Sequence, residues 1–417
     1  MLTYAFIALL LTDIVLRLWL SSRQIRHVTA HRNAVPVEFA SRIGLHSHQR
    51  AADYTVARAK LSMVERVFDA AVLVALTLMG GLELIDTWVS QLTTHDFLRQ
   101  LLLLGVVIGT LSLLGLPFTL YKQFVLEARF GFNRMTPRLF AQDAIKGIAV
   151  GLVLGVPLVA VVLWLMQAAG QYWWIWAWAV WAGFNLLLQV LYPLVIAPLF
   201  NTFKPLDNPS LAERIQALAQ RCGFALNGLF VMDGSRRSAH GNAYFTGFGK
   251  SRRIVFFDTL LSRLNPDEIE AVLAHELGHF ARRHIIKRIA LSFVLALGFF
   301  AVLGWAASMP AFYEALGVQP NLGGSNDAMA LILFFMVLPV CTFMLTPLAS
   351  RYSRKHEFEA DHYASTQSRP QYLVSALVKL YDDNAATLTP DPVHSAFYDS
   401  HPPAALRIRQ LQTQGAA

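Results

Sequence analysis

Seven long apolar stretches constrain this chain more than any other feature of its sequence. Each is long enough to cross about 30 Å of hydrocarbon, because a helix rises about 1.5 Å per residue. Hydrophobic residues make up 55% of the 417 residues and charged residues only 15%, whereas a soluble domain carries roughly a quarter of charged residues. We therefore expect an all-α integral membrane protein with seven transmembrane helices. The stretches run approximately over residues 3–21, 66–88, 100–121, 147–167, 173–199, 288–308 and 328–349.

The basic residues of the loops predict the orientation in the membrane. Lys and Arg are frequent after the first and third stretches, but the loops near 89–98, 168–172 and 309–326 contain neither. Because cytoplasmic loops collect these residues, we expect the N-terminus outside and the C-terminus in the cytoplasm. The same bias explains the formal charge of +8. No base-stacking motif accompanies this charge, so we expect no nucleic-acid partner.

This orientation divides the chain into four expected segments. Residues 1–199 form an N-terminal membrane region with five helices, and residues 288–349 contain helices six and seven. Two polar segments, 200–287 and 350–417, then both lie on the cytoplasmic face. Asp13 and Arg17 lie four residues apart in the first apolar stretch, so we expect them to pair and to face protein or water rather than lipid.

The stretch NPDEIEAVLAHELGHFARRH, residues 265–284, has the pattern of a zinc-binding helix. Asn265 as N-cap, Pro266 at the first helical position and Glu268 three residues after the cap predict where the helix begins. The two cysteines of the chain are far apart, which excludes a disulfide scaffold and a cysteine zinc finger.

His275 and His279 lie one helical turn apart on the same face, so their imidazoles can converge on one tetrahedral zinc ion. Glu276 lies about 100° around the helix from His275, where it can reach a zinc-bound water without binding the metal. A catalytic zinc normally takes three protein ligands. The third is expected from the segment 353–361, in which Glu357 and Asp361 share a helix face. One of these carboxylates can bind zinc while the other orients a ligand histidine, and their spacing leaves the assignment open.

The chain resembles the type 1 CAAX prenyl endopeptidases, which are membrane zinc proteases. Beyond HELGH, the resemblance is carried by four stretches. They are GFNRMTP (131–137), GSRRSAHGNAYFTGFGKSRRIVFFDTLL (234–261), EFEAD (357–361) and HSAFYDSHPPAALR (394–407). The resemblance implies a barrel of seven membrane helices around a water-filled chamber, with a zincin-like protease domain on the cytoplasmic side. One Zn²⁺ per chain is implied, with Glu357 as its third ligand and Asp361 supporting a histidine.

The same resemblance implies roles for several further residues. Asn242 is similar to a substrate-binding residue of the family, and His401 and Arg407 are similar to groups that stabilise substrate or oxyanion. His240 is either a polar active-site group or a loop histidine without a role. The segments NAYFTGFG and RRIVFFD alternate apolar and polar residues around Gly249-Lys250 and predict a small β-hairpin, whose edge could pair with an extended substrate.

These residues predict hydrolysis of a peptide bond, with Glu276 as general base and His401 or Arg407 beside the oxyanion. The expected substrate is a peptide or protein, prenylated if it is of the CAAX type, cleaved near its C-terminus. The alternative is a quality-control protease for membrane proteins that does not depend on prenylation. A transporter would leave the zinc motif unexplained, and a structural zinc site would close the fourth ligand position. The C-terminal Gln-Gly-Ala-Ala is not an ER-retention signal and fits a bacterial cytoplasmic membrane. The oligomeric state is left open by the sequence.

Overall fold

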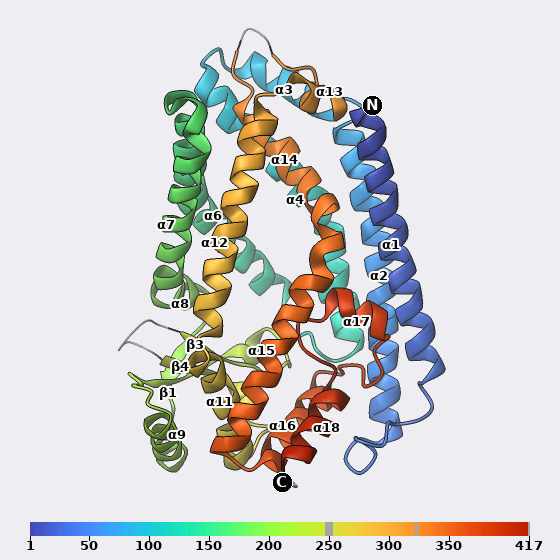
Figure 1. The fold of residues 1–417 in the computed structure, drawn as a ribbon, viewed down its shortest axis with the longest axis vertical. Coiled ribbons are helices and arrows are strands. Elements are labelled where there is room, and N and C mark those ends of the chain that lie inside the picture. The colour runs from blue at the N-terminus through green and yellow to red at the C-terminus, as the bar shows by residue number, and fades with distance from the viewer. Residues whose placement is uncertain (247–252, 322–323, 416–417) are drawn as a thin grey trace.

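Long helices stand upright around a central space, and a smaller region of short helices and strands closes one end (Figure 1). The computed structural model describes residues 1–246, 253–321 and 324–415. The elements of the upper region in Figure 1 are α1 (Leu2–Ala30), α2 (Leu45–Leu76), α3 (Gly81–Leu92), α4 (Asp96–Tyr121), α5 (Glu127–Arg129), α6 (Pro137–Ala168), α7 (Trp173–Leu191), α8 (Ala197–Phe200), α12 (His284–Ala307), α13 (Pro310–Ala315) and α14 (Asp327–Thr342).

Within the described residues, six helices are long and apolar enough to cross a membrane, and the bent pair α2 and α3 supplies a seventh span if it is counted as one. The prediction of an all-α membrane protein is therefore confirmed. The second expected span, 66–88, is not one straight helix: α2 ends at Leu76 and α3 begins at Gly81, with a bend of 56° between their axes.

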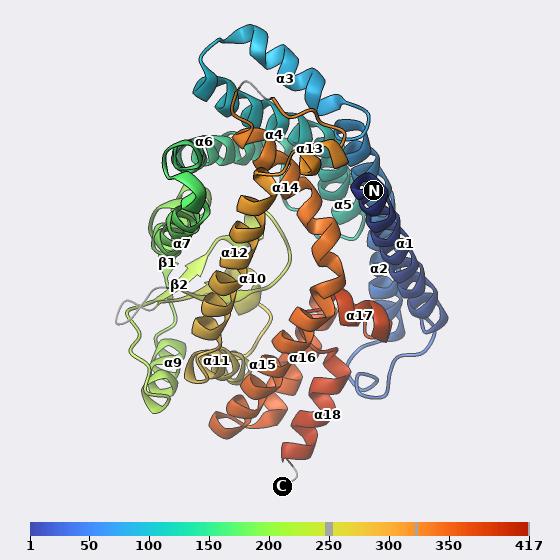
Figure 2. The same ribbon diagram turned by 45° about the horizontal axis from the view of Figure 1, so that its top comes forward.

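The break between α2 and α3 has a local cause. Gly80 has a φ of +80°, in the left-handed region that glycine adopts without steric cost. The bend brings Gly81 against the end of α2: a β-carbon at Gly81 would stand 2.7 Å from the carbonyl oxygen of Ala75, so a larger residue does not fit there. As a result α3 lies across the top of the helices instead of continuing through them (Figure 2).

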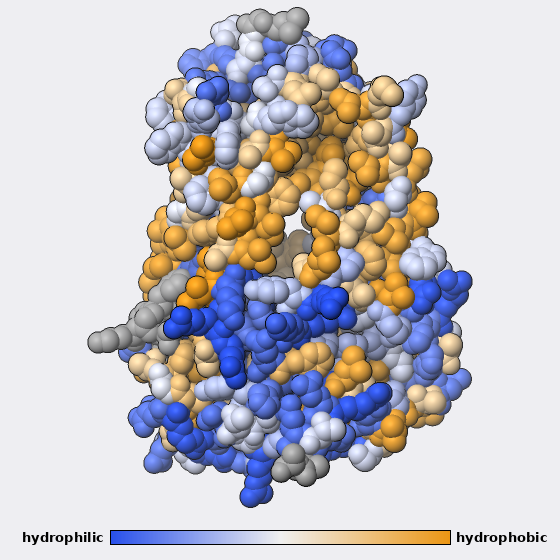
Figure 3. Space-filling view, in the orientation of Figure 1, coloured by the Kyte–Doolittle hydropathy of each residue, from blue (hydrophilic) through white to orange (hydrophobic). Residues whose placement is uncertain are grey.

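The membrane helices form an open ring. In a close-packed bundle each helix buries one face, but the most apolar parts of Pro137–Ala168 and Gly170–Phe200 are only 11% and 6% buried. One side of these helices therefore faces the outside of the ring and the other side faces its interior. The space-filling view shows a hollow between α12 and α14, halfway up the molecule (Figure 3). This arrangement confirms the expected barrel around a chamber.

An apolar belt covers the face of the ring seen in Figure 3, and a strongly hydrophilic band follows directly below it. Ile286, Val294 and Trp305 on α12 are each more than 60% exposed in this belt. Such a continuous exposed apolar surface is stable only in contact with lipid. The molecule is therefore a multi-pass membrane protein, with the smaller region outside the hydrocarbon.

The predicted pair Asp13–Arg17 is present in α1. The guanidinium Nε lies 2.8 Å from the Asp13 carboxylate, and Asp13 is buried. The guanidinium also stacks on Phe343, 3.6 Å from the ring centroid, so the pair faces protein as expected.

The lower region combines helices with one four-stranded sheet. The strands follow the order β1-β2-β4-β3, with β2 and β4 parallel and the other two pairs antiparallel. The expected hairpin is confirmed as β3 and β4, where Tyr244 pairs with Val255; its turn at Gly249-Lys250 lies outside the described residues. The elements are β1 (Phe203–Pro205), α9 (Pro209–Arg221), β2 (Leu229–Met232), β3 (Ala243–Thr246), β4 (Arg253–Phe257), α10 (Asp258–Leu261), α11 (Pro266–Ala281), α15 (Thr346–Gln367), α16 (Pro370–Asp383), α17 (Pro392–Tyr398) and α18 (Ala404–Gly415).

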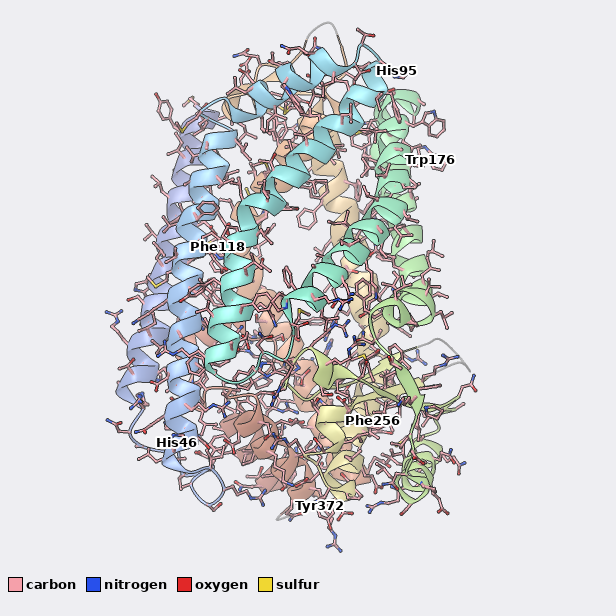
Figure 4. All side chains as sticks on the ribbon, turned by 180° about the vertical axis from the view of Figure 1, so that it is seen from behind. His46, His95, Phe118, Trp176, Phe256 and Tyr372 are labelled. Atoms are coloured by element: carbon pink, nitrogen blue, oxygen red, sulfur yellow. The ribbon has the colours of Figure 1, made fainter. Side chains whose placement is uncertain are left out.

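A second hydrophobic core lies between this sheet and the helices α9, α11 and α16. Phe256 of β4 and Leu273 of α11 are almost completely buried in it. Seen from behind, Phe256 and Tyr372 lie below the level of Phe118 and Trp176, which belong to the ring (Figure 4). The lower core therefore holds α11 in a fixed position at the mouth of the ring.

Candidate metal centre

The helix that carries HELGH begins as predicted. The Asn265 side chain accepts a hydrogen bond from the backbone N–H of Glu268, and the Glu268 carboxylate accepts one from the N–H of Asn265, each at 2.9 Å. Glu268 also accepts hydrogen bonds from Ser375 and Lys379 of α16, both at 2.7 Å. This capping box therefore ties the start of α11 to the neighbouring helix.

Three side chains converge between α11 and α15. The Nε2 atoms of His275 and His279 lie 3.3 Å apart. The Glu357 carboxylate lies 3.5 Å from the first of these atoms and 3.4 Å from the second. Among the described residues, these three form the group of side chains that could hold a metal ion. The helix α15 brings Glu357 to this point from 78 residues further along the chain than His279.

The geometry fits zinc. On a tetrahedral zinc ion with bonds of about 2.0–2.1 Å, two histidine nitrogens lie about 3.3–3.4 Å apart, and the Nε2 atoms of His275 and His279 are 3.3 Å apart. Glu357 presents Oε2 at 3.5 Å from the first nitrogen and Oε1 at 3.4 Å from the second, and one ligand atom from each of the three residues lies within 4.8 Å of the others. One oxygen of Glu357, Oε2, is buried and has no hydrogen-bond partner within the described part of the chain. A buried carboxylate oxygen needs a hydrogen-bond donor or a cation. The guanidinium of Arg407 stands 3.8 Å from Oε2, and a metal ion between the three groups would be a nearer cation.

A buried ion network supports His275. Its Nδ1 lies 2.9 Å from the carboxylate of Asp361, which is completely buried. Arg407 of α18 donates two hydrogen bonds to the same carboxylate, at 2.8 and 2.6 Å. The ring of His275 is therefore oriented with Nε2 toward the other two ligands, as in the carboxylate–histidine pairs of zinc sites.

Without a metal ion, the surroundings shift the pKa values of the two histidines in opposite directions. Burial alone would lower the pKa of His275, but the carboxylates of Asp361 and Glu357 raise it to about 9. Burial and the charge on His275 lower the pKa of His279 to about 3. Burial also raises the pKa of the Glu276 carboxyl above its usual range. Near neutral pH the metal-free site thus holds a proton on His275, which a metal ion displaces.

His401 and Arg407 both lie beside Glu357, but in different surroundings. The Nε2 of His401 is 3.4 Å from Oε1 of Glu357, and its side chain is 62% exposed. Arg407 is only 6% exposed, and its Nη1 lies 3.8 Å from Oε2 of Glu357. An exposed side chain can contact a substrate, whereas the guanidinium of Arg407 is hydrogen-bonded to Asp361. The geometry therefore favours His401 for contact with substrate and Arg407 for positioning.

Asn242 and His240 lie in the segment that leads into β3. The side chain of Asn242 is exposed, and its Oδ1 accepts a hydrogen bond from the next backbone N–H. His240 stacks on Phe132 at 4.3 Å and contacts Asn384 at 2.9 Å through Nδ1. These contacts of His240 link loops and favour a structural role, and they do not involve the three converging side chains.

Two residues of the site received no role from the sequence. His284 is buried at the first position of α12, and its Nδ1 lies 3.1 Å from Nδ1 of His279. Its Nε2 lies 2.8 Å from a carboxylate oxygen of Glu359. In a continuous helix residue 284 would stand about 140° around from His279. The chain changes direction at Arg283, whose φ is +56°, and this turn brings His284 next to His279. A positive φ at an arginine has no signal in the local sequence.

Comparison with known proteins agrees with this architecture. The family described as "CAAX prenyl protease N-terminal, five membrane helices" matches residues 24–202, and peptidase family M48 matches residues 205–414. The chain is similar to a rice protein named CAAX prenyl protease 1 homolog, with 38% identity over 76% of this chain and 74% of the relative. The human protein of the same name is 36% identical over 75% of this chain and 73% of its own length.

A solved structure covers almost the whole chain. The crystal structure of Ste24p from S. mikatae superposes with a TM-score of 0.92 at 30% sequence identity, covering 99% of each chain. The fold of this chain is therefore shared over its full length. This chain belongs to peptidase family M48, as a membrane metalloprotease related to the type 1 CAAX prenyl proteases.

Proposed function

We propose that this chain is a zinc endopeptidase that cleaves CAAX-type, membrane-associated proteins near their C-terminus. The observation that carries the proposal is the convergence of His275, His279 and Glu357, with one possible ligand atom from each within 4.8 Å of the others. The relatives named CAAX prenyl protease 1 support the substrate class.

The three converging residues would hold the zinc ion, which supplies a Lewis acid for water and for the scissile carbonyl. Among the described residues the metal group has three members, and His401 stands beside it, 3.4 Å from Oε1 of Glu357. Three protein ligands are the number typical of a catalytic zinc ion, which supports a water in the fourth position. A site built for structure alone would close that position with another protein ligand.

Glu276 is the general base of this proposal. It follows ligand His275 directly, and burial raises the pKa of its carboxyl, which brings its proton affinity closer to what transfer near neutral pH requires. Glu276 accepts the proton of the attacking water and returns it to the leaving amine. His401 donates to the oxyanion, and Arg407 holds Asp361 and thereby His275.

The substrate is proposed to lie extended along β3. Within the described residues β3 is an edge strand, and it begins one residue after Asn242. An edge strand offers free backbone groups to an extended peptide, and the Asn242 side chain can add a hydrogen bond next to it. The charge bias of the loops supports an orientation with the N-terminus outside and this site in the cytoplasm.

Cleavage of matched peptides tests the proposal. Purified protein is given a farnesylated CAAX peptide, the same peptide with a free cysteine, and one with serine at that position. The released C-terminal fragment is quantified by mass spectrometry, with Glu276→Gln protein as the blank. Cleavage of the farnesylated peptide alone supports the proposal. Equal cleavage of all three would replace it by a prenylation-independent membrane protease, and no cleavage of any peptide would contradict it.

A further inference from the structure

A second carboxylate of α15 reaches the site by way of His284. The Glu359 carboxylate contacts Nε2 of His284 at 2.8 Å, and Nδ1 of His284 contacts Nδ1 of His279 at 3.1 Å. The His284 ring is almost completely buried and stacks on His356, with centroids 3.9 Å apart and planes within 9°. The ring therefore has little freedom to rotate away from these two partners.

The donors and acceptors along this chain of contacts can be assigned one after another. Nε2 of His279 faces His275 and Glu357, where a lone pair is needed for a metal. A neutral imidazole carries its N–H on the other nitrogen, so Nδ1–H of His279 donates to His284. Nδ1 of His284 is then an acceptor, its N–H is on Nε2, and this N–H donates to Glu359. With these assignments, each contact from His279 to Glu359 has one hydrogen-bond donor and one acceptor.

We propose that His284 and Glu359 are positioning residues for the metal ligand His279. This inference rests on the proposed function, because it assumes that His279 binds zinc through Nε2. The two ligand histidines are then supported in different ways: His275 donates directly to Asp361, and His279 donates to Glu359 through His284. All three carboxylates of EFEAD thus serve one metal site, Glu357 as ligand and the other two as supports.

Zinc affinity measured by competition with a chelating dye tests the proposal. Loss of a group that orients a ligand histidine typically weakens metal binding 10- to 100-fold. His284→Phe keeps an aromatic ring for stacking on His356 but removes the acceptor, so we expect a loss in that range. His284→Asn places a carbonyl oxygen near the position of Nδ1, and we expect affinity within about threefold of wild type.

Glu359 gives a second series. Glu359→Gln keeps an acceptor for Nε2–H of His284 and is expected to have little effect, whereas Glu359→Leu removes it. The Glu359 side chain is 34% exposed. Since water can partly replace the lost acceptor, we expect a smaller loss for Glu359→Leu than for His284→Phe. The visible spectrum of the Co²⁺-substituted protein should change in His284→Phe and return toward wild type in His284→Asn.

His356→Phe is the matched control, because it changes a neighbouring buried ring while retaining the stack and the contact between His279 and His284. Its zinc affinity is expected to equal that of wild type. If His284→Phe binds zinc as tightly as wild type, the proposed support of His279 by His284 and Glu359 is wrong while the zinc site stands. The same holds if His356→Phe lowers the zinc affinity as much as His284→Phe does. If wild-type protein binds no zinc, the proposed function itself fails.

Discussion

Gly278 of α11 lies against Ala360 of α15, so closely that a β-carbon at position 278 would stand 3.0 Å from the Ala360 α-carbon and 3.0 Å from the Tyr363 β-carbon. Ala360 and Ala364 on the facing side are completely buried. This contact sets the distance between the two helices that carry the three converging side chains. The glycine in HELGH is therefore required by packing rather than by backbone conformation.

The first prediction concerns this contact. Gly278→Ala is expected to push α15 away by a few tenths of an ångström and to cost about 1–3 kcal/mol through overpacking. Thermal unfolding in detergent should show a lowered midpoint, and zinc affinity should fall because Glu357 moves with α15. Gly298→Ala on α12 is the control, since a β-carbon there meets nothing within 4 Å. Equal midpoints and equal zinc affinities for the two variants would mean that the helix spacing does not depend on Gly278.

Arg407 is expected to matter far more for stability than its neighbour Arg409. Arg407→Leu leaves the fully buried Asp361 carboxylate without its cation, and breaking a buried pair in this way costs about 3–5 kcal/mol. Arg409 pairs with Glu38 but is 63% exposed, so Arg409→Leu should cost about 1 kcal/mol or less. Thermal unfolding of both variants measures the contrast. A smaller loss for Arg407→Leu than for Arg409→Leu would contradict the buried network.

Acid should weaken the start of α11. Burial would raise the pKa of Glu268, but hydrogen bonds from Lys379, Ser375 and the Asn265 N–H outweigh it, so its pKa in the folded protein is lowered. A lowered folded pKa means that the stabilisation is present above the unfolded pKa of about 4.3 and is lost as pH falls through the folded value.

The measurement is the difference in unfolding midpoint between wild type and Glu268→Gln, taken from pH 7 downward. We expect this difference to be largest at neutral pH and to shrink below about pH 4.5, as the carboxylate becomes protonated. Glu314→Gln, at an exposed position on the opposite end of the molecule, should show no such trend. A difference for Glu268→Gln that grows on acidification would reverse the assigned sign.

The proposed orientation is tested by labelling of single cysteines. In protein with Cys222→Ser and Cys341→Ser, Gln319→Cys lies in the loop after α13, and Thr366→Cys lies near the end of α15; both side chains are exposed. A membrane-impermeant maleimide on intact cells should modify position 319 at once and position 366 only after permeabilisation. The opposite pattern would place the metal centre outside the cell.

The sequence was sufficient for the features that depend on local spacing. The apolar stretches, the pairing of Asp13 with Arg17, the capping box at Asn265 and the hairpin of β3 and β4 each follow from residues close together in the chain. The exception within a local stretch was 66–88, because hydrophobicity does not report the bend that Gly80 permits between α2 and α3.

Contacts between distant segments were harder to predict. β2 lies parallel to β4, and no local sequence pattern predicts that pairing. Glu359 had no visible partner, because His284 lies 75 residues earlier and reaches it only after the chain turns at Arg283. The roles given to His401, Arg407 and Asn242 came from resemblance and stay predictions, and the role of His240 was left open. The structure adds that Arg407 is buried against Asp361 and that His240 stacks on Phe132.

The metal content of purified protein tests the central claim most directly. Wild type and Glu276→Gln should each contain one equivalent of zinc by inductively coupled plasma mass spectrometry, because we propose Glu276 as a base and not as a ligand. Glu357→Ala should contain almost none, since two histidines alone hold zinc poorly. Wild type without zinc, or Glu357→Ala with a full equivalent, would contradict the assignment of His275, His279 and Glu357 as the metal site.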